Sequence, residues 1–206
     1  MLVSESYNIW CETYDEVQNK TRDLESIIQK EILDYHEFNS ILELGCGTGK
    51  NTKWLISKCQ SLLAVDISEG MIKKAASGIN DPKVQFIQAN IDEEWTFSHP
   101  PYNLISCSLV LEHIRDISSV FQKASQNLSK GGFFYIAELH PFKQYLGSTA
   151  RFEINSRETQ VQSFTHHVSD YISSALSNNF SLTKLKEGFD ENVAIPRILA
   201  MLFVKK

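Results

Sequence analysis

Three alternating glycines, preceded by an acidic residue, are the part of this chain with the clearest chemical meaning. Gly45, Gly47 and Gly49 follow an apolar, strand-like segment that carries Glu43. Glycine allows backbone dihedrals that other residues avoid, and it leaves no Cβ between the loop and a ligand. A helical segment follows, so backbone N–H groups of the loop and of the helix start would face that ligand. Because a carboxylate so close would repel a pyrophosphate, Glu43 indicates a ligand that carries an ammonium group.

A second carboxylate, Asp66, ends the next apolar run. At the end of a parallel strand it can accept two hydrogen bonds from the hydroxyls of a ribose. The alternatives are a tight turn without a ligand and, for Asp66, a simple helix cap before Ser68. The dinucleotide fingerprint G-x-G-x-x-G is disfavoured, because Lys50 stands where its third glycine would be.

Four histidines could act on a second reactant. His113 follows the fourth strand-like run, where catalytic groups can lie, and it could equally be a structural hydrogen-bonding residue. His140, His166 and His167 border an irregular stretch over 140–165. We expect His113 or His140 to serve as a base, and His140, His166 and His167 to contact the substrate. Each is also explained as a loop histidine, and no carboxylate spacing near them predicts a metal site.

Strand-like apolar runs alternate with helical stretches and must position these residues. Strands are predicted near 41–45, 62–66, 84–88, 103–107, 132–139, 180–187 and 197–204. Helices are predicted near 5–18, 20–35, 49–58, 69–77, 116–128 and 168–177. Continuous apolar runs suit strands that are buried on both faces. The alternation predicts an α/β, doubly wound sheet whose ligands bind at the carboxyl ends of its strands.

Composition and charge limit the class of protein. The chain has 206 residues, of which 42% are hydrophobic and 22% charged, with a formal net charge of -5. This predicts one domain over 1–206 and argues against a nucleic-acid partner. Cys11, Cys46, Cys59 and Cys107 show no C-x-x-C pair and indicate reduced thiols, as in a cytoplasmic protein. The N-terminus does not resemble a secretory signal, and no apolar run approaches the roughly 18 residues of a membrane span.

These motifs together resemble those of the class I S-adenosylmethionine-dependent methyltransferases, specifically the small-molecule group called type 11 or 12. The matching segments are 42–49, 63–71, 86–92, 102–113 and 128–132. The resemblance covers nearly the whole chain. It implies a Rossmann-like, seven-stranded sheet with helices on both faces, a helical lid over 1–40 and a cover for the acceptor site over 140–165.

The resemblance also implies a cofactor, S-adenosyl-L-methionine, which leaves as S-adenosyl-L-homocysteine. The residues expected to bind it are Tyr14, Glu43, Gly45, Cys46, Gly47, Gly49, Asp66, Ile67, Met71, Asn90, Ile91, Ser106 and Cys107. Asn90 replaces the Asp that usually contacts the adenine amino group, and it keeps an acceptor oxygen. Asn103 replaces another common Asp, and His167 stands where related chains often carry Arg.

The implied reaction is in-line transfer of a methyl group to an O, N or C atom of a small-molecule acceptor. The alternatives are transfer to a tRNA base or a protein side chain, and a catalytically weak protein that binds the cofactor. A nicotinamide-dependent reductase is disfavoured by the glycine spacing. We expect no membrane partner and either a monomer or a homodimer.

Overall fold

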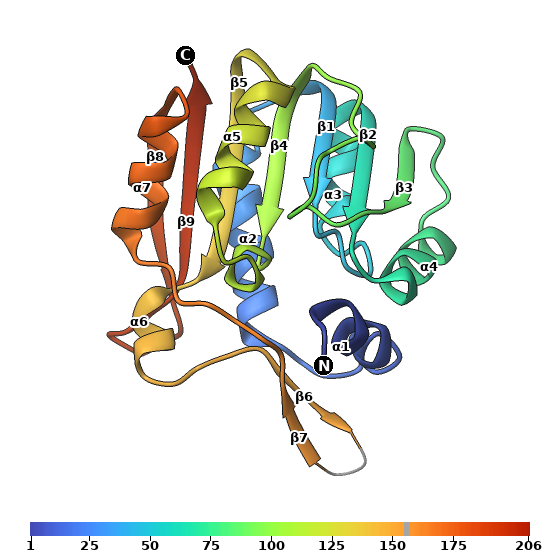
Figure 1. Cartoon of the computed structure of the whole chain (residues 1–206), viewed down its shortest axis with the longest axis vertical. Helices are drawn as coiled ribbons and strands as arrows, with labels where there is room; N and C mark the ends of the chain where they lie inside the picture. Colours follow the sequence, from blue (N-terminus) through green and yellow to red (C-terminus); the bar gives the residue numbers. More distant parts are fainter. Residues whose placement is uncertain (155–156) are drawn as a thin grey trace.

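A seven-stranded mixed sheet with helices on both faces forms the centre of the molecule (Figure 1). The computed structural model describes residues 1–154 and 157–206. The strand order is β3-β2-β1-β4-β5-β9-β8. The strands are β1 (Phe38–Leu44), β2 (Cys59–Asp66), β3 (Val84–Gln88), β4 (Tyr102–Ser108), β5 (Leu128–Leu139), β8 (Phe180–Phe189) and β9 (Pro196–Lys205). β1 to β5 are parallel and β9 is antiparallel to both of its neighbours, which confirms the predicted Rossmann-like sheet.

The apolar runs form strands because alternate residues enter two different cores. In β1, Leu42 and Leu44 join a cluster on one face of the sheet, whereas Ile41 joins the cluster on the other. All three are fully buried. Burial of each such side chain stabilises the fold by about 1.5–3 kcal/mol. A strand flanked by two cores reads as a continuous apolar run, which is the pattern found in the sequence.

Helices cover both faces of the sheet (Figure 1). The longer helices of the sheet layers are α2 (Lys20–Leu33), α4 (Glu69–Gly78), α5 (Ile117–Asn127) and α7 (Val168–Ser177). Between β1 and β2 the chain forms α3 (Thr52–Leu55) and the 3-10 turn η1 (Ile56–Lys58). α2 and α3 contribute to the core on one face, and α5 and α7 to the core on the other. The parallel strands therefore end between two helical layers, at one edge of the sheet.

Two predicted segments differ from the structure. The helix expected over 5–18 is shorter, because α1 (Val3–Trp10) gives way to turns that end at Asn19, the N-cap of α2. In the intervening stretch the Thr13 N–H donates to the Trp10 carbonyl oxygen in a tight turn, and the Asp15 carboxylate accepts a hydrogen bond from the Thr48 hydroxyl, which connects this stretch to the glycine loop.

The segment over 140–165 is not irregular throughout. It contains α6 (Pro141–Tyr145) and a two-stranded hairpin of β6 (Arg151–Ile154) and β7 (Arg157–Gln160). The strands have only four residues each, too few for a clear period in the sequence. Part of the expected acceptor cover, residues 155–156, lies outside the described residues, and the single domain over 1–206 stays a prediction.

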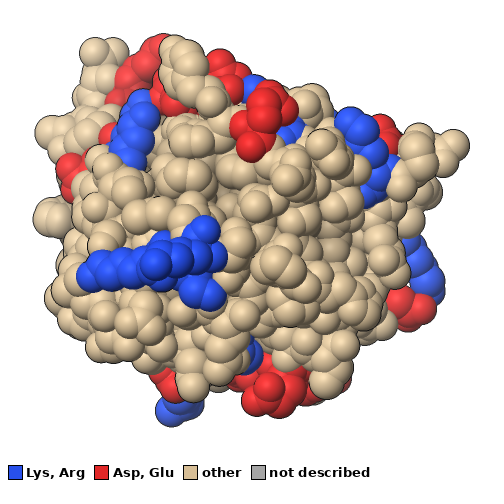
Figure 2. Space-filling view, turned by 90° about the horizontal axis from the view of Figure 1, so that it is seen from above, with Lys and Arg blue, Asp and Glu red and all other residues tan. Residues whose placement is uncertain are grey.

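The carboxyl ends of the parallel strands, α1 and the β6–β7 hairpin lie at the same end of the molecule (Figure 1). Figure 2 shows the opposite end, where one strip of Lys and Arg side chains lies on the face and other charged side chains of both signs lie toward the rim. Within residues 1–154 and 157–206, no helix combines the length and the apolar character that crossing a membrane requires.

Candidate functional site

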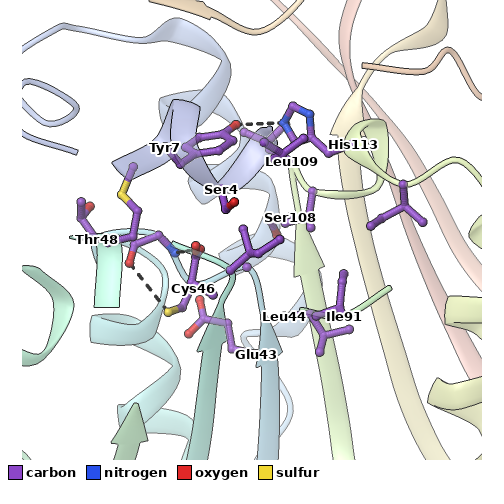
Figure 3. Close-up of a pocket in the computed structure, with 18 of the residues that line it drawn as sticks. Ser4, Tyr7, Glu43, Leu44, Cys46, Thr48, Ile91, Ser108, Leu109 and His113 are labelled. Atoms are coloured by element: carbon purple, nitrogen blue, oxygen red, sulfur yellow. Dashed lines mark hydrogen bonds between the residues drawn. The ribbon is translucent and has the colours of Figure 1, made fainter. Parts of the chain in front are cut away.

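A cavity of about 400 Å³ lies at the carboxyl ends of β1, β2 and β4, beside α1 (Figure 3). Most of the residues expected to bind the cofactor line it. These are Tyr14, Glu43, Gly45, Cys46, Gly47, Asp66, Ile67, Met71, Asn90, Ile91 and Ser106. Gly49 and Cys107 do not line the cavity. Gly49 turns the chain with a φ of +87°, and Cys107 is buried in the core.

The glycine loop has a backbone conformation that residues other than glycine adopt only with strain. Gly45 and Gly47 have φ values of +70° and +54°. The N–H groups of Gly45 and Cys46 donate to the Val65 carbonyl oxygen at 2.8 and 2.9 Å, which fastens the loop to β2. A Cβ at Gly45 would lie 2.2 Å from Val110, whereas a Cβ at Gly47 would meet no protein atom within 4 Å. Gly47 therefore leaves open space on the ligand side of the loop.

Asp66 connects this loop to the start of α4. Its Oδ2 accepts a hydrogen bond from the Gly47 N–H at 2.9 Å, and its Oδ1 accepts one from the Ser68 N–H at 2.8 Å. Burial raises the pKa of the Asp66 carboxyl, and these two hydrogen bonds oppose that rise. Each oxygen of a carboxylate can accept a second hydrogen bond, so Asp66 keeps the capacity to bind two ligand hydroxyls.

Two further acidic side chains, Glu43 and Glu25, face the same cavity. Burial raises the pKa of Glu43 to about 8, although Thr52 donates a hydrogen bond to its Oε2 at 2.6 Å. Glu25, on α2, accepts hydrogen bonds from Asn51 at 2.8 Å and Ser108 at 2.7 Å. No motif marks Glu25 in the sequence. Together with Asp66, these acids favour a ligand that carries positive charge.

Arg22 and Asn51 add two buried polar atoms to the lining of this cavity. Arg22 Nε and Asn51 Oδ1 have no hydrogen-bond partner among the described residues. The Arg22 guanidinium lies 3.9 Å from the centroid of the Tyr14 ring and donates from its Nη2 to the Val17 carbonyl oxygen. An unpaired donor on one lining residue and an unpaired acceptor on another suit a ligand that carries both a carboxylate and an ammonium group.

A buried lysine binds the loop 91–93, which contributes Ile91 and Asp92 to the cavity wall. Lys123 Nζ donates to the carbonyl oxygens of Ile91 at 2.7 Å, Asp92 at 3.0 Å and Glu93 at 3.0 Å. Burial lowers the pKa of Lys123. The amide of Asn90 is already engaged, because its Oδ1 accepts from the Asp92 N–H and its Nδ2 donates to Glu93. The loop that holds Asn90 and Ile91 is therefore positioned by Lys123.

We expect Lys123→Met to destabilise the protein, because it leaves carbonyl groups of this loop without their buried donor. Each unpaired buried group costs about 1–3 kcal/mol. Urea unfolding should show a lower midpoint. Lys130→Met is the matched control, since Lys130 is exposed on β5 and its replacement should change stability by less than about 0.5 kcal/mol. Equal stability of the two variants would contradict this role for Lys123.

His113 lies in the cavity as one member of a hydrogen-bonded chain (Figure 3). The Tyr7 hydroxyl is 2.9 Å from His113 Nε2, and His113 Nδ1 is 2.6 Å from the Gln162 carbonyl oxygen. Because a carbonyl can only accept, Nδ1 carries the proton and Nε2 accepts from Tyr7. Burial raises the pKa of the Tyr7 hydroxyl well above its ordinary value, and the neighbouring Tyr14 and Glu112 raise it further.

The structure does not bring the other three histidines to this cavity. His140 caps α6 by accepting from the Phe142 N–H, and its Nε2 is 3.0 Å from Glu187. His166 Nε2 lies 3.1 Å and 2.8 Å from two carbonyl oxygens of the segment 111–114. His167 Nδ1 is 2.7 Å from the Tyr145 hydroxyl. Contacts within the protein account for all three, and no metal-binding cluster occurs within the described residues.

The segment 1–17 contacts several parts of the cavity wall. Asn8 Oδ1 accepts from the Ser68 hydroxyl at 2.7 Å and from the Gly70 N–H at 3.0 Å. Asp15 accepts from the Thr48 hydroxyl at 2.9 Å. The Trp10 ring stacks on Phe152 of the hairpin, with a distance of 5.2 Å between ring centroids. This segment thus joins the glycine loop, the start of α4 and the hairpin.

Comparisons with known proteins agree with this arrangement. A family profile described as a methyltransferase domain matches residues 41–132. The chain is 23% identical to an uncharacterized methyltransferase of Emericella nidulans, over 88% of this chain and 76% of that protein. It is 28% identical to the malonyl-[acyl-carrier protein] O-methyltransferase of Acetivibrio thermocellus, over 63% of this chain. The chain spans 44% of the length of that relative.

The fold is shared with solved structures. The crystal structure of a putative S-adenosylmethionine dependent methyltransferase from Listeria monocytogenes is similar, with a TM-score of 0.76 and 21% sequence identity. The similarity covers 90% of this chain and 99% of that one. At this identity the likeness concerns the fold alone.

Proposed function

We propose that this chain is a class I S-adenosylmethionine-dependent methyltransferase and that it transfers a methyl group to a small-molecule acceptor. The observation that carries the proposal is the cluster of Glu25, Glu43 and Asp66 around the glycine-loop cavity. A cofactor with a sulfonium and an ammonium group would give these buried acids a positively charged partner. One relative is named an O-methyltransferase, and oxygen is among the acceptor atoms considered for this chain.

The cofactor would lie with its ribose on Asp66 and its adenine between Ile67 and Ile91. Both isoleucines line the cavity and offer apolar surface to a flat ring. Its carboxylate would pair with the free Nε of Arg22, and its ammonium group would approach Asn51 Oδ1 and Glu43. This placement gives a hydrogen-bond partner to Arg22 Nε and Asn51 Oδ1, which have none among the described residues.

Positioning accounts for most of what the protein contributes to the reaction. The sulfonium charge already activates the methyl group, so the acceptor atom needs alignment with the S–CH₃ bond and exclusion of water. We propose that residues 1–40 close over the cofactor as a lid, and that 140–165 cover the acceptor. The contacts of Asn8 with Ser68 and of Trp10 with Phe152 support this arrangement.

Calorimetry with S-adenosylhomocysteine tests the proposal directly. We expect saturable binding of S-adenosylhomocysteine, which presents the same amino-acid, ribose and adenine groups, and no binding of NADH. The product lacks the positive sulfur, so its affinity isolates the contribution of these groups. Failure of both S-adenosylhomocysteine and S-adenosylmethionine to bind would overturn the proposed function.

Arg22→Met should lower the affinity for S-adenosylhomocysteine and leave the affinity for a shorter ligand unchanged. A hydrogen bond to a charged group contributes about 1.5–3 kcal/mol, which corresponds to roughly a 10- to 150-fold loss of affinity. The matched control is 5′-methylthioadenosine, which keeps the adenosine and lacks the amino-acid group. If both ligands lose affinity equally in calorimetric titrations, Arg22 does not pair with the carboxylate.

A further inference from the structure

Apolar side chains surround the Tyr7–His113 pair at its end of the cavity. Some come from the start of α1, which carries Tyr7, and the others from the segment that carries His113. They are Leu2, Val3, Leu109, Val110 and Ile114. Ser4 and Ser108, which lie near Tyr7 and Leu109 in Figure 3, are uncharged polar residues of the lining, and Gln162 is another. A molecule seated here would meet hydrocarbon on most sides and one hydroxyl–imidazole pair.

The charges of the cavity leave no cation for a negatively charged acceptor. Among the described residues that line it, the cationic side chains are Arg22 and Lys50. Arg22 is assigned to the cofactor carboxylate, and Lys50 forms an ion pair with Asp23. A carboxylate or phosphate group near Tyr7 would therefore be desolvated without compensation and would lie among acidic residues. These charges favour an acceptor without negative charge.

Resting on the proposed function, we propose that the acceptor is an uncharged, largely apolar molecule with a weakly acidic hydroxyl group, such as a phenol, and that Tyr7 and His113 relay its proton away. The proton of the acceptor hydroxyl passes to the Tyr7 oxygen while the Tyr7 proton passes to His113 Nε2. The acceptor oxygen forms the new O–CH₃ bond, the S–CH₃ bond breaks, and its electron pair stays on sulfur. The products are a methyl ether, a neutral thioether and an imidazolium.

The hydrogen bonds fix the direction of this relay. The Gln162 carbonyl holds the proton of His113 on Nδ1, so Nε2 has a free electron pair directed at the Tyr7 hydroxyl. The raised pKa of Tyr7 means that its hydroxyl passes a proton on instead of resting as a phenolate. Two acidic side chains lie near or interact with the imidazole ring. Glu112 Oε1 lies 4.0 Å from His113 Nε2, and Asp66 interacts electrostatically with the same ring.

Absorbance spectroscopy with 4-nitrophenol tests the relay, because only its phenolate absorbs strongly in the visible. The probe is added to protein saturated with S-adenosylhomocysteine, at a pH where free 4-nitrophenol is mostly neutral. We expect the phenolate band to grow on binding, and 4-nitrobenzoate to bind at least about 10-fold more weakly. Tyr7→Phe and His113→Gln should bind 4-nitrophenol without the phenolate band. With 4-nitrophenol as acceptor they should lose about 10²- to 10⁴-fold in turnover.

Tyr102→Phe is the matched control, since it removes a tyrosine hydroxyl that accepts a hydrogen bond from the His99 N–H outside the cavity. It should behave as the unaltered protein does. Tighter binding of 4-nitrobenzoate, a missing phenolate band in the unaltered protein, or an unchanged band in Tyr7→Phe would each overturn the proposal. Tyr7→Phe alone decides the matter if His113→Gln does not fold. Absence of S-adenosylhomocysteine binding would instead overturn the proposed function itself.

Discussion

Replacing Asp66 by Ala should reduce the affinity for S-adenosylhomocysteine by about two to four orders of magnitude. The carboxylate is expected to accept two hydrogen bonds from the ribose, each contributing about 1.5–3 kcal/mol when the acceptor is charged. It also holds the Gly47 and Ser68 N–H groups, so its removal loosens the glycine loop and the start of α4 together. Calorimetric titration measures the effect.

Two controls separate ribose recognition from loss of structure. Asp81→Asn changes a half-buried acid in the turn before β3, outside the cavity, and should leave the affinity unchanged. Asp66→Asn keeps an acceptor oxygen for one backbone N–H and should fall between the unaltered protein and Asp66→Ala. Retention of full affinity by Asp66→Ala would place the ribose elsewhere, and the assignment of the whole cofactor would then have to change.

The central sheet was predictable because its strands have a clear hydrophobic pattern in the sequence. Residues such as Ile41 and Leu42 enter opposite cores, and this forces apolar side chains at every position of the strand. The helix over 168–177 was predicted with the bounds that it has. The hairpin of β6 and β7 left no such trace. Its four-residue strands pair with each other, and among the side chains described in it Phe152 is the buried one.

The site was predictable only where local sequence fixes position. Gly47 and Asp66 lie at the ends of adjacent parallel strands, so their proximity follows from the fold. Glu25 and Arg22 reach the same cavity from α2, a helix whose placement depends on packing between distant segments. No spacing rule joins residue 25 to residue 43. Tertiary contacts alone bring them together.

The sequence did not indicate which of the histidines line this cavity. His140, His166 and His167 were expected at the acceptor site because they border an unassigned segment of the chain. In the structure His140 caps a helix and His167 precedes one, while His166 bridges carbonyl oxygens near the cavity. Local hydrogen bonding at helix starts competes effectively for such side chains. Tyr7, which no motif distinguished, contacts His113 instead.

Glu43→Gln should stabilise the protein without ligand above neutral pH, and it should also lower the affinity for the cofactor. Burial raises the pKa of Glu43 to about 8 in the folded protein, whereas the unfolded chain titrates near its ordinary value of 4.5. Between these values the folded state holds a proton that the unfolded state has lost. Stability from this group is therefore complete below about pH 4.5 and decreases as the pH rises to 8, by about 1.4 kcal/mol per pH unit.

Urea unfolding between pH 5 and pH 9 measures this dependence, with and without S-adenosylhomocysteine. Glu43→Gln should reduce the slope but not abolish it, because burial also raises the pKa of Glu138 to about 8. A bound ammonium group favours the charged form of Glu43, so the ligand should stabilise the unaltered protein more than the variant at high pH. Identical slopes in the two proteins would mean that Glu43 is already ionised without a ligand. The cavity would then hold a fixed negative charge, and the affinity for the cofactor would not depend on the titration of Glu43. If the slopes differ as expected, the Glu43 carboxylate lowers the folding stability of the protein without ligand and raises the affinity for the cofactor.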